Sequence, residues 1–334
     1  MQAVTESLLL WFKITDMKIV ELLNTSDKTR FSFELLPPLK GNDINTIYQS
    51  IDPLLEFNPA YINITYHQEE IVYKKHSSGL LEKKTVRKRP GTVAISAAIK
   101  YKYKDVLVVP HIICGGFTKE ETENALIDLQ FLGINNILVV RGDPEKSQKV
   151  FTPEPDGHTH SIDLLKQIIS MNKGKYLDEE LLNSTPTDFS VGVAGYPEKH
   201  CEAPNMNTDM FFLKQKIDAG AEFIVTQMFF DNKKYFSFVE KCREMGINVP
   251  IIPGIKPLSV RSQISTLPFT FHIDVPEELV KEVFKCKNND AVRQVGVEWA
   301  IAQSKELIKS GAPAVHYFTM GKPDNIQKIA REVF

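Results

Sequence analysis

The stretch LVVPHIICGGFTKEETENALIDLQFLGINNILVV, residues 107–140, decides the fold class. It begins with an apolar run at 107–113 and ends with another at 136–140, and each has the length and composition of a buried strand. Between them, a capping box that begins at Thr118 predicts the start of a helix, and Gly133 predicts its end. Strand, helix and strand in this order predict a parallel βαβ unit.

The same alternation continues along the rest of the chain. Runs that predict strands lie at 29–35, 61–66, 107–113, 136–140, 189–194, 223–226, 250–253 and 314–318. Further helical patterns lie at 43–55, 161–171, 208–219, 232–245, 276–286, 290–310 and 325–333. Eight strands followed by a closing helix predict a single α/β domain, a (β/α)8 TIM barrel. An open doubly wound sheet is the alternative, and the absence of GxGxxG and GxxxxGK[ST] motifs disfavours it.

Two stretches do not fit this repeat and are interpreted as long loops. Residues 67–106 form a long insertion after the second strand, and residues 144–160 form a polar loop. The insertion carries a basic cluster of Lys74, Lys75, Lys83, Lys84, Arg87, Lys88 and Arg89. Because the total charge is balanced, we interpret the cluster as a solvated surface, with binding of a polyanion as the alternative.

The composition excludes several classes of protein. The 334 residues include 40 Lys and Arg against 42 Asp and Glu, which gives a formal net charge of −2, and 43% are hydrophobic. Disordered chains and proteins that bind nucleic acid through bulk positive charge have a different balance. The four cysteines form no CxxC pair, so we expect no disulfide framework and a reducing, cytoplasmic compartment.

The amino terminus shows no targeting signal. The apolar run at 8–12 is short, follows Glu6 and lacks a basic start, which argues against a signal peptide. No apolar run approaches the roughly 18 residues of a membrane span. Met17 is a second candidate start, so we expect residues 1–16 to be an extension without function and residues 17–334 to form the catalytic domain.

The active site of a TIM barrel lies at the carboxyl ends of its strands. Alternation along the first strand predicts that Ser32 and Glu34 point into the barrel, whereas Phe33 faces the helices. Burial would raise the pKa of Glu34 and make it a general acid, and a structural salt bridge is the alternative. Asp143 offers a second carboxylate at this rim, directly after Gly142, which permits close approach of the backbone.

Other polar residues follow the remaining strands. His111 ends the third strand as a base, a ligand or a packed polar group. The Gln227 amide can donate and accept hydrogen bonds, which suits the edge of a heterocycle. The small residues before Tyr196 indicate a flat ligand lying on the backbone. The histidines lack metalloenzyme spacing, so no metal site is predicted.

Eight segments, in order along the chain, resemble the methylenetetrahydrofolate reductase family of one-carbon metabolism. They are SFELLPP (32–38), NITY (63–66), PH (110–111), RGD (141–143), AGYPEKH (194–200), LKQKIDAGA (213–221), TQMFFD (226–231) and IPGI (252–255). The resemblance implies a TIM barrel that binds FAD tightly and non-covalently without a Rossmann motif. It also implies that NADH or NADPH delivers a hydride to FAD and leaves. 5,10-Methylenetetrahydrofolate then takes the hydride at the same face and becomes 5-methyltetrahydrofolate.

The resemblance also implies residue roles. Glu34 is similar to the general acid that protonates the folate and helps to open its five-membered ring. Asp143 is similar to the carboxylate that lies near the flavin and meets the pterin. Substrate contacts are implied for Gln227, Lys322, Phe318 and Leu267. Cofactor contacts are implied for Thr65, His111, Arg141, Gly142, Asp143, His160, Ser161, Ala194, Tyr196, His200, Asp209 and Lys216.

The chain departs from the family pattern at two places. His160 and Ser161 stand where the family often has Tyr-Ala. Lys322 stands where an arginine is common, so it keeps the positive charge but loses the guanidinium fork. We expect no inhibition by S-adenosylmethionine, because the sequence ends after the closing helix. By resemblance we expect a homo-oligomer, with no nucleic-acid or membrane partner.

Two other functions stay open from the sequence. A TIM-barrel enzyme that uses tetrahydrofolate without redox chemistry, such as a methyltransferase, could use the same rim of Glu34, Asp143 and Gln227. A module that binds a polyanion or a protein through the basic cluster would show salt-sensitive binding. Flavin in the purified protein distinguishes the reductase from both.

Overall fold

The computed structural model describes residues 17–25, 28–144, 148 and 150–334. Its centre is a closed barrel of parallel strands in the order β1-β10-β9-β8-β7-β6-β5-β2. Their bounds are β1 (Arg30–Leu35), β2 (Tyr61–Ile64), β5 (Leu107–Ile113), β6 (Asn136–Val140), β7 (Ser190–Gly195), β8 (Phe223–Met228), β9 (Ile251–Ile255) and β10 (Ala314–Phe318). Each overlaps one of the eight predicted runs, so the predicted TIM barrel is confirmed.

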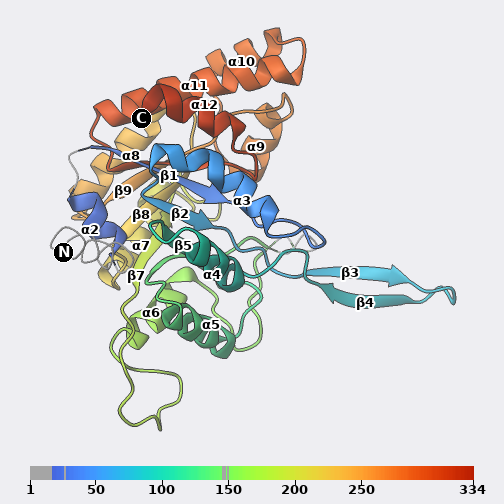
Figure 1. Ribbon diagram of the computed structural model, residues 1–334, viewed down its shortest axis with the longest axis vertical. Coiled ribbons are helices and arrows are strands. Elements are labelled where there is room, and N and C mark those ends of the chain that lie inside the picture. Colours follow the sequence, from blue (N-terminus) through green and yellow to red (C-terminus); the bar gives the residue numbers. More distant parts are fainter. Residues whose placement is uncertain (1–16, 26–27, 145–147, 149) are drawn as a thin grey trace, which may run out of the picture.

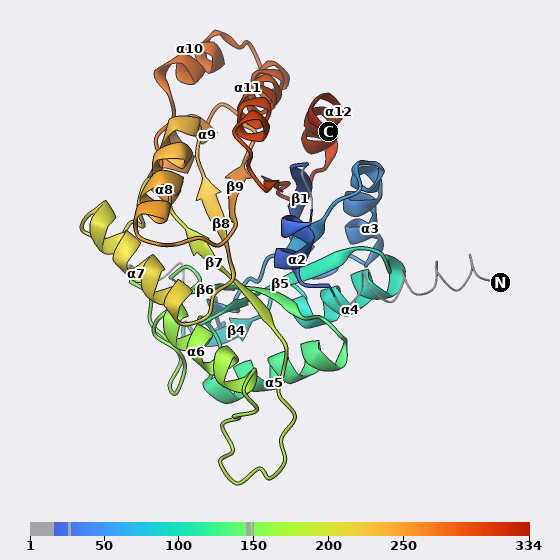
Figure 2. The same cartoon turned by 90° about the vertical axis from the view of Figure 1, so that its left-hand side faces the viewer.

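Helices surround the barrel (Figures 1 and 2). They are α3 (Asn45–Ile51), α4 (Thr92–Lys102), α5 (Lys119–Phe131), α6 (Ser161–Met171), α7 (Met206–Asp218), α8 (Asn232–Glu244), α9 (Gln263–Phe271), α10 (Glu277–Lys285), α11 (Asn289–Lys309) and α12 (Asp324–Val333), with a 3-10 helix η1 (Asp52–Phe57) after α3. The predicted capping box begins α5, where the Thr118 hydroxyl accepts from the Glu121 N–H at 3.1 Å. The Glu121 carboxylate accepts from the Thr118 N–H at 2.8 Å, so both halves of the box form.

The alternation predicted for β1 is also confirmed. The ring of Phe31 packs outward, with its centroid 5.9 Å from that of Phe57 and 5.4 Å from that of Phe334. The hydroxyl of Ser32 points inward and lies 3.1 Å from Nδ1 of His316 on β10. Because side chains alternate along a strand, Glu34 shares the inner face with Ser32.

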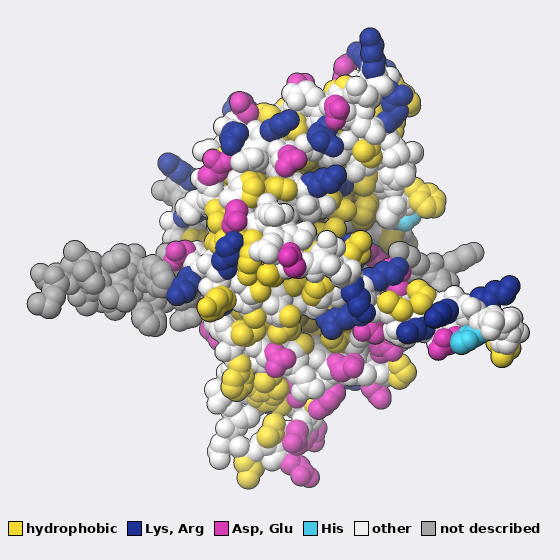
Figure 3. Space-filling view, turned by 45° about the vertical axis from the view of Figure 1, so that its right-hand side comes forward, with side chains coloured by type: hydrophobic (Ala, Val, Ile, Leu, Met, Phe, Trp, Pro, Cys, Tyr) yellow, Lys and Arg dark blue, Asp and Glu magenta, His cyan; other side chains and the backbone are white. Residues whose placement is uncertain are grey.

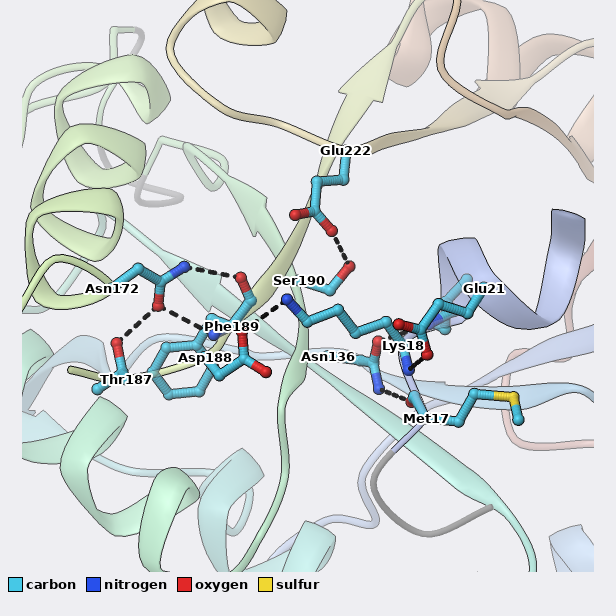
Figure 4. A network of polar contacts seen from close by, with 11 residues as sticks. Met17, Lys18, Glu21, Asn136, Asn172, Thr187, Asp188, Phe189, Ser190 and Glu222 are labelled. Atoms are coloured by element: carbon cyan, nitrogen blue, oxygen red, sulfur yellow. Dashed lines mark hydrogen bonds and ion pairs between the residues drawn. The ribbon is translucent and has the colours of Figure 1, made fainter. Parts of the chain in front are cut away.

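The amino-proximal end of the barrel is closed by a short helix, α2 (Ile19–Asn24), which the sequence analysis did not anticipate. Ile19 and Leu23 are buried in the apolar cluster inside this end of the barrel. At the start of β6, the Asn136 amide accepts from the Ile19 N–H at 2.8 Å and donates to the Met17 carbonyl at 3.1 Å (Figure 4). This network lies where the strands begin. The helix therefore does not cover the carboxyl ends of the strands, where a ligand can enter the opposite mouth of the barrel.

The interpretation of residues 67–106 as one long loop was wrong. The segment contains an antiparallel hairpin, β3 (Glu70–Lys75) and β4 (Leu81–Val86), followed by α4. Helix α4 is the helix of the second βα unit, and it escaped notice because its apolar and small residues surround the helix without a clear polar face. Helix α9 was also not anticipated. Within the described ranges, no helix is both long and apolar enough to span a membrane.

Candidate active site

A buried carboxyl group lies at the carboxyl end of β1. The side chain of Glu34 is only 14% exposed, and its Oε2 lies 3.6 Å from Nε2 of His111 on β5. Burial raises the pKa of Glu34 to about 8, and the positive charge of Lys256 opposes part of this rise. Burial lowers the pKa of His111 to about 3. At neutral pH the pair is therefore a carboxylic acid beside a neutral imidazole and not a salt bridge.

Lys256 follows the segment IPGI (252–255) and was not among the predicted site residues. It follows β9 directly and is 5% exposed. Burial lowers its pKa to about 8, and the negative charge of ionised Glu34 would raise it. The rule that strand ends carry the chemistry would have found this residue, since it occupies the first position after the seventh barrel strand.

The barrel interior around and below Glu34 holds further polar groups, and Asn63 on β2 is the register partner of Glu34. The amide nitrogen and oxygen of Asn63 are buried and have no hydrogen-bond partner among the described residues. The ring of Tyr61 stacks on His316 with centroids 5.9 Å apart, and burial lowers the pKa of His316 to about 3. Buried polar groups normally form hydrogen bonds, so the unpaired side-chain atoms of this layer can bind water or a ligand.

A second polar group surrounds Arg141, directly after β6. Its two terminal nitrogens donate to the two carboxylate oxygens of Glu202 at 2.6 and 2.7 Å. The guanidinium also lies 5.0 Å from the ring centroid of Phe151. This bidentate geometry fixes the plane of the arginine. Glu202 was not among the predicted site residues, since nothing in its spacing relates it to Arg141.

Four expected cofactor residues come together beside Arg141. The His200 N–H donates to Oδ2 of Asp209 at 2.9 Å, and the rings of His200 and Tyr196 meet edge to face at 4.8 Å. Burial, then the charges of Asp209 and Asp143, raise the pKa of Tyr196. Burial lowers the pKa of Lys216 on α7, and Asp209 opposes this effect. Residues far apart in sequence thus form one charged cradle.

Gly142 and Asp143 lie at the rim between these two groups. Gly142 has φ of +88°, and a Cβ there would lie 3.2 Å from Cδ1 of Ile113, so glycine suits both the backbone and the space. The side chain of Asp143 is exposed at the rim. Its backbone carbonyl accepts a hydrogen bond from Nε2 of Gln68 at 3.2 Å.

The other expected cofactor contacts lie around the same mouth. The Thr65 hydroxyl donates to the Leu35 carbonyl at 3.2 Å, next to Glu34. His160 precedes α6 and Ser161 begins it, at a helix end whose N–H groups suit an anion. Ala194 lies near the end of β7, opposite Val225.

The expected substrate contacts are more scattered. The Gln227 side chain accepts from the Met228 N–H at 2.9 Å, where the pairing of β8 with β9 shifts register. Phe318 ends β10, with its ring centroid 5.4 Å from that of His316. Leu267 is buried in an apolar cluster outside the barrel. Lys322 is exposed in the loop after β10. Phe318 thus lies between the polar layer and the apolar cluster that contains Leu267.

Metal ligands are not gathered anywhere in the part of the chain that the structure describes, since no group of three or more His, Cys, Asp and Glu side chains could hold an ion. The fold and site thus define a class: a (β/α)8 barrel with a protonated carboxyl group and a charged cradle at the strand ends. The model of the methylenetetrahydrofolate reductase family matches residues 18–333, and the chain belongs to this family.

Individual relatives agree with this assignment. "Methylenetetrahydrofolate reductase (NADH) 1" of Arabidopsis thaliana is 30% identical over 330 residues, which cover 94% of this chain and 50% of the relative. The chain thus spans about half the length of the first eukaryotic relatives it matches. "5,10-methylenetetrahydrofolate reductase" of Pectobacterium carotovorum is 28% identical over 306 residues, which cover 91% of this chain and 89% of the relative.

Among solved structures, an uncharacterized protein from Clostridium thermocellum that binds two copies of 5-methyl-5,6,7,8-tetrahydrofolic acid superposes with a TM-score of 0.56. It is 12% identical, and the match covers 95% of this chain and 98% of that chain. At this identity the likeness shows the fold alone.

Proposed function

We propose that this chain reduces 5,10-methylenetetrahydrofolate to 5-methyltetrahydrofolate, using FAD and a hydride from NADH or NADPH. Membership of the family supports the reaction class. The observation that carries the proposal is Glu34, a carboxyl group whose pKa burial raises to about 8 at the strand ends. A group that holds its proton at neutral pH in a ligand-binding mouth is suited to general-acid catalysis.

The residues of the cradle fit FAD. Nε of Arg141 is buried without a hydrogen-bond partner among the described residues, and the next residue, Gly142, has a positive φ that glycine adopts without strain. Lys216 and the α6 amino terminus suit the oxygens of a phosphate group. The residues that would hold the cofactor are Thr65, His111, Arg141, Gly142, Asp143, His160, Ser161, Ala194, Tyr196, His200, Asp209 and Lys216. When bound, FAD supplies the two-electron step that accepts hydride from the nicotinamide and yields it to the folate.

Glu34 supplies the proton for opening the folate ring. Its carboxyl proton passes to a ring nitrogen of 5,10-methylenetetrahydrofolate, the bond from that nitrogen to the methylene carbon breaks, and a cationic iminium remains at the other nitrogen. Ionised Glu34 then lies near Lys256, whose charge lowers the pKa of the carboxyl group and so stabilises the carboxylate. The carboxylate of Asp143 at the rim favours the cationic intermediate.

The remaining residues position the substrate. We propose that Gln227 binds the pterin edge, and that Phe318 and Lys322 contact the more distant part of the folate. Leu267 is buried in the apolar cluster against which Phe318 packs, and we propose that it contributes to the apolar contacts of the substrate there. Neutral His111 and Asn63 supply hydrogen-bonding atoms beside Glu34 without adding charge.

Anaerobic titration tests the proposal. The purified protein should show flavin absorbance, or acquire it with added FAD, and NADH or NADPH should bleach it. Addition of 5,10-methylenetetrahydrofolate should then restore the oxidised spectrum. A colourless protein that cannot be reconstituted with FAD contradicts the proposal. Retained folate binding in such a protein would favour a tetrahydrofolate enzyme without redox chemistry.

A further inference from the structure

A hairpin projects far from the barrel, and we call it the arm: β3, β4 and the turn at 76–80 (Figure 1). Lysine and arginine side chains follow its length (Figure 3). Tyr73, Leu80 and Leu81 are large apolar residues that are 63%, 72% and 65% exposed. A lone two-stranded hairpin is marginally stable in water, and clustered exposed apolar side chains mark interaction surfaces. The arm therefore has the features of a docking element.

The base of the arm is fixed to the barrel. The Lys40 N–H donates to the Lys88 carbonyl at 2.7 Å, and the Arg89 guanidinium donates to the Pro37 carbonyl. At this base, Lys88 also forms an ion pair with Glu70, the first residue of β3. These contacts hold the arm in one direction, so it presents its outer strand edges as a preformed surface.

Each strand of the arm has one edge that is not paired within the two-stranded sheet. Such an edge can accept the same strand of a second copy, antiparallel, around a two-fold axis perpendicular to the sheet. Residues opposite each other then share a face, and faces alternate along a strand. The axis therefore lies between the two strands, level with one residue and not level with the midpoint between two successive residues. That central residue lies opposite its own copy.

The edge of β4 is unsuited to this pairing. Its two central residues are Lys83 and Lys84, so an axis at either of them sets a lysine directly opposite the same lysine of the second copy. Like charges directly opposite are destabilising, and lysines on an edge strand are a known defence against edge-to-edge pairing. The two outer edges of the arm therefore differ in their capacity to dimerise.

The edge of β3 is suited to it. With the axis level with Val72, this residue lies opposite its own copy. Glu70 of each copy then lies opposite Lys74 of the other copy, which gives two such pairs. Opposite charges across strands are stabilising, and the carboxylate of Glu70 can bind Lys74 of the second copy in addition to Lys88. An axis at Tyr73 lacks this match, because it sets Val72 opposite Lys74.

We propose that β3 pairs with β3 of a second copy of this chain, forming a four-stranded sheet with its two-fold axis at Val72. From Val72, the strand extends two residues toward the barrel but three toward the tip, and the turn at 76–80 lies beyond. At about 3.4 Å per residue, the tip of each arm passes the base of the other. The barrel of the second copy then covers Leu80 and Leu81. This inference is independent of the proposed reaction.

Cysteine crosslinking tests the register in the full chain. Cys201 is exposed and the other three cysteines are buried, so the background carries Cys201→Ser. We expect mild oxidation to convert most of a Val72→Cys variant to a covalent dimer on a non-reducing gel. Lys84 lies opposite Val72 within the arm, so Lys84→Cys is the matched control. This variant should form no covalent dimer and should run as a monomer on the same gel. Absent crosslinking of Val72→Cys, or equal crosslinking of both, overturns the proposal.

Light scattering tests the interface without crosslinking. Val72→Lys places two lysines at the axis and should halve the mass of the wild-type oligomer, whereas Thr85→Lys on β4 should leave the mass unchanged. A wild-type chain that is monomeric overturns the proposal. Should that monomer instead bind single-stranded nucleic acid in a salt-dependent manner, the basic arm would be assigned to a polyanion.

Discussion

Nε2 of His111 lies 3.6 Å from Oε2 of Glu34, and both groups are neutral at neutral pH. The imidazole does not take the proton, because burial lowers its pKa to about 3. The carboxyl group keeps the proton, because burial raises its pKa to about 8. The proton is therefore available to a substrate that enters the mouth of the barrel.

Reduction of the folate should depend on the acid form of Glu34. A raised carboxyl pKa means that the proton is held below about pH 8 and lost above it. The rate of the folate half-reaction should be level below this pH and fall about tenfold per pH unit above it. Single-turnover measurements across this range check the expectation, and a rate that instead rises with pH would contradict the role of an acid.

Replacing Lys256 should move this pH dependence upward. Its positive charge lowers the pKa of Glu34, so Lys256→Met should shift the fall in rate to higher pH. Lys322→Met is the matched control, since Lys322 is exposed in the loop after β10. It should raise KM for the folate but leave the pH profile in place. An unmoved or lowered profile in Lys256→Met would show that the two side chains do not interact.

Glu202 should support FAD binding through Arg141. Glu202→Gln removes the bidentate carboxylate that fixes the guanidinium, and we expect FAD affinity to fall about tenfold, or ~1.4 kcal/mol. Fluorescence titration of the apoprotein with FAD measures this change. Glu244→Gln, at the exposed end of α8, is the control and should bind FAD as the wild type does. Unchanged affinity in Glu202→Gln would exclude this positioning role.

Helix α2 and the residues that attach it to the start of β6 should contribute to stability and not to catalysis. Asn136→Ala removes two hydrogen bonds to residues 17 and 19 and should lower the free energy of unfolding by about 1–3 kcal/mol. Lys18→Ala, which removes an exposed ion pair with Asp188, should cost less than about 1 kcal/mol. We propose that removal of residues 1–16 changes neither stability nor activity. Urea denaturation with parallel assays checks all three variants, and a larger cost for Lys18→Ala would reverse this ranking.

The barrel could be predicted because its signals are local. Each buried strand is a short apolar run, and the capping box of α5 lies within four residues of sequence. Glu34 was found by the same local logic, since alternation along β1 places it inside the barrel. Helix α4 and the arm were missed because the helix lacks a polar face and the strands of the arm are largely exposed, so neither follows the usual burial pattern.

The partnerships within the site could not be predicted from the chain. Arg141 and Glu202 are separated by 61 positions, and only the fold brings them into contact. The same is true of Lys256 and Glu34, whose charges interact across the barrel mouth. The substrate contact of Leu267 was implied by resemblance of position alone and stays a prediction, since its side chain is buried in the apolar cluster against which Phe318 also packs.

The most direct test of the account separates the two half-reactions in Glu34→Gln. Glutamine keeps the size of the side chain but has no proton of suitable acidity to give. Under anaerobic rapid mixing, reduction of bound FAD by NADH or NADPH should proceed within about threefold of the wild-type rate. Reoxidation by 5,10-methylenetetrahydrofolate should fall by about 10²–10⁴-fold, the usual contribution of general-acid catalysis. Equal loss in both half-reactions, or wild-type reoxidation, would contradict the assignment of Glu34 as the acid.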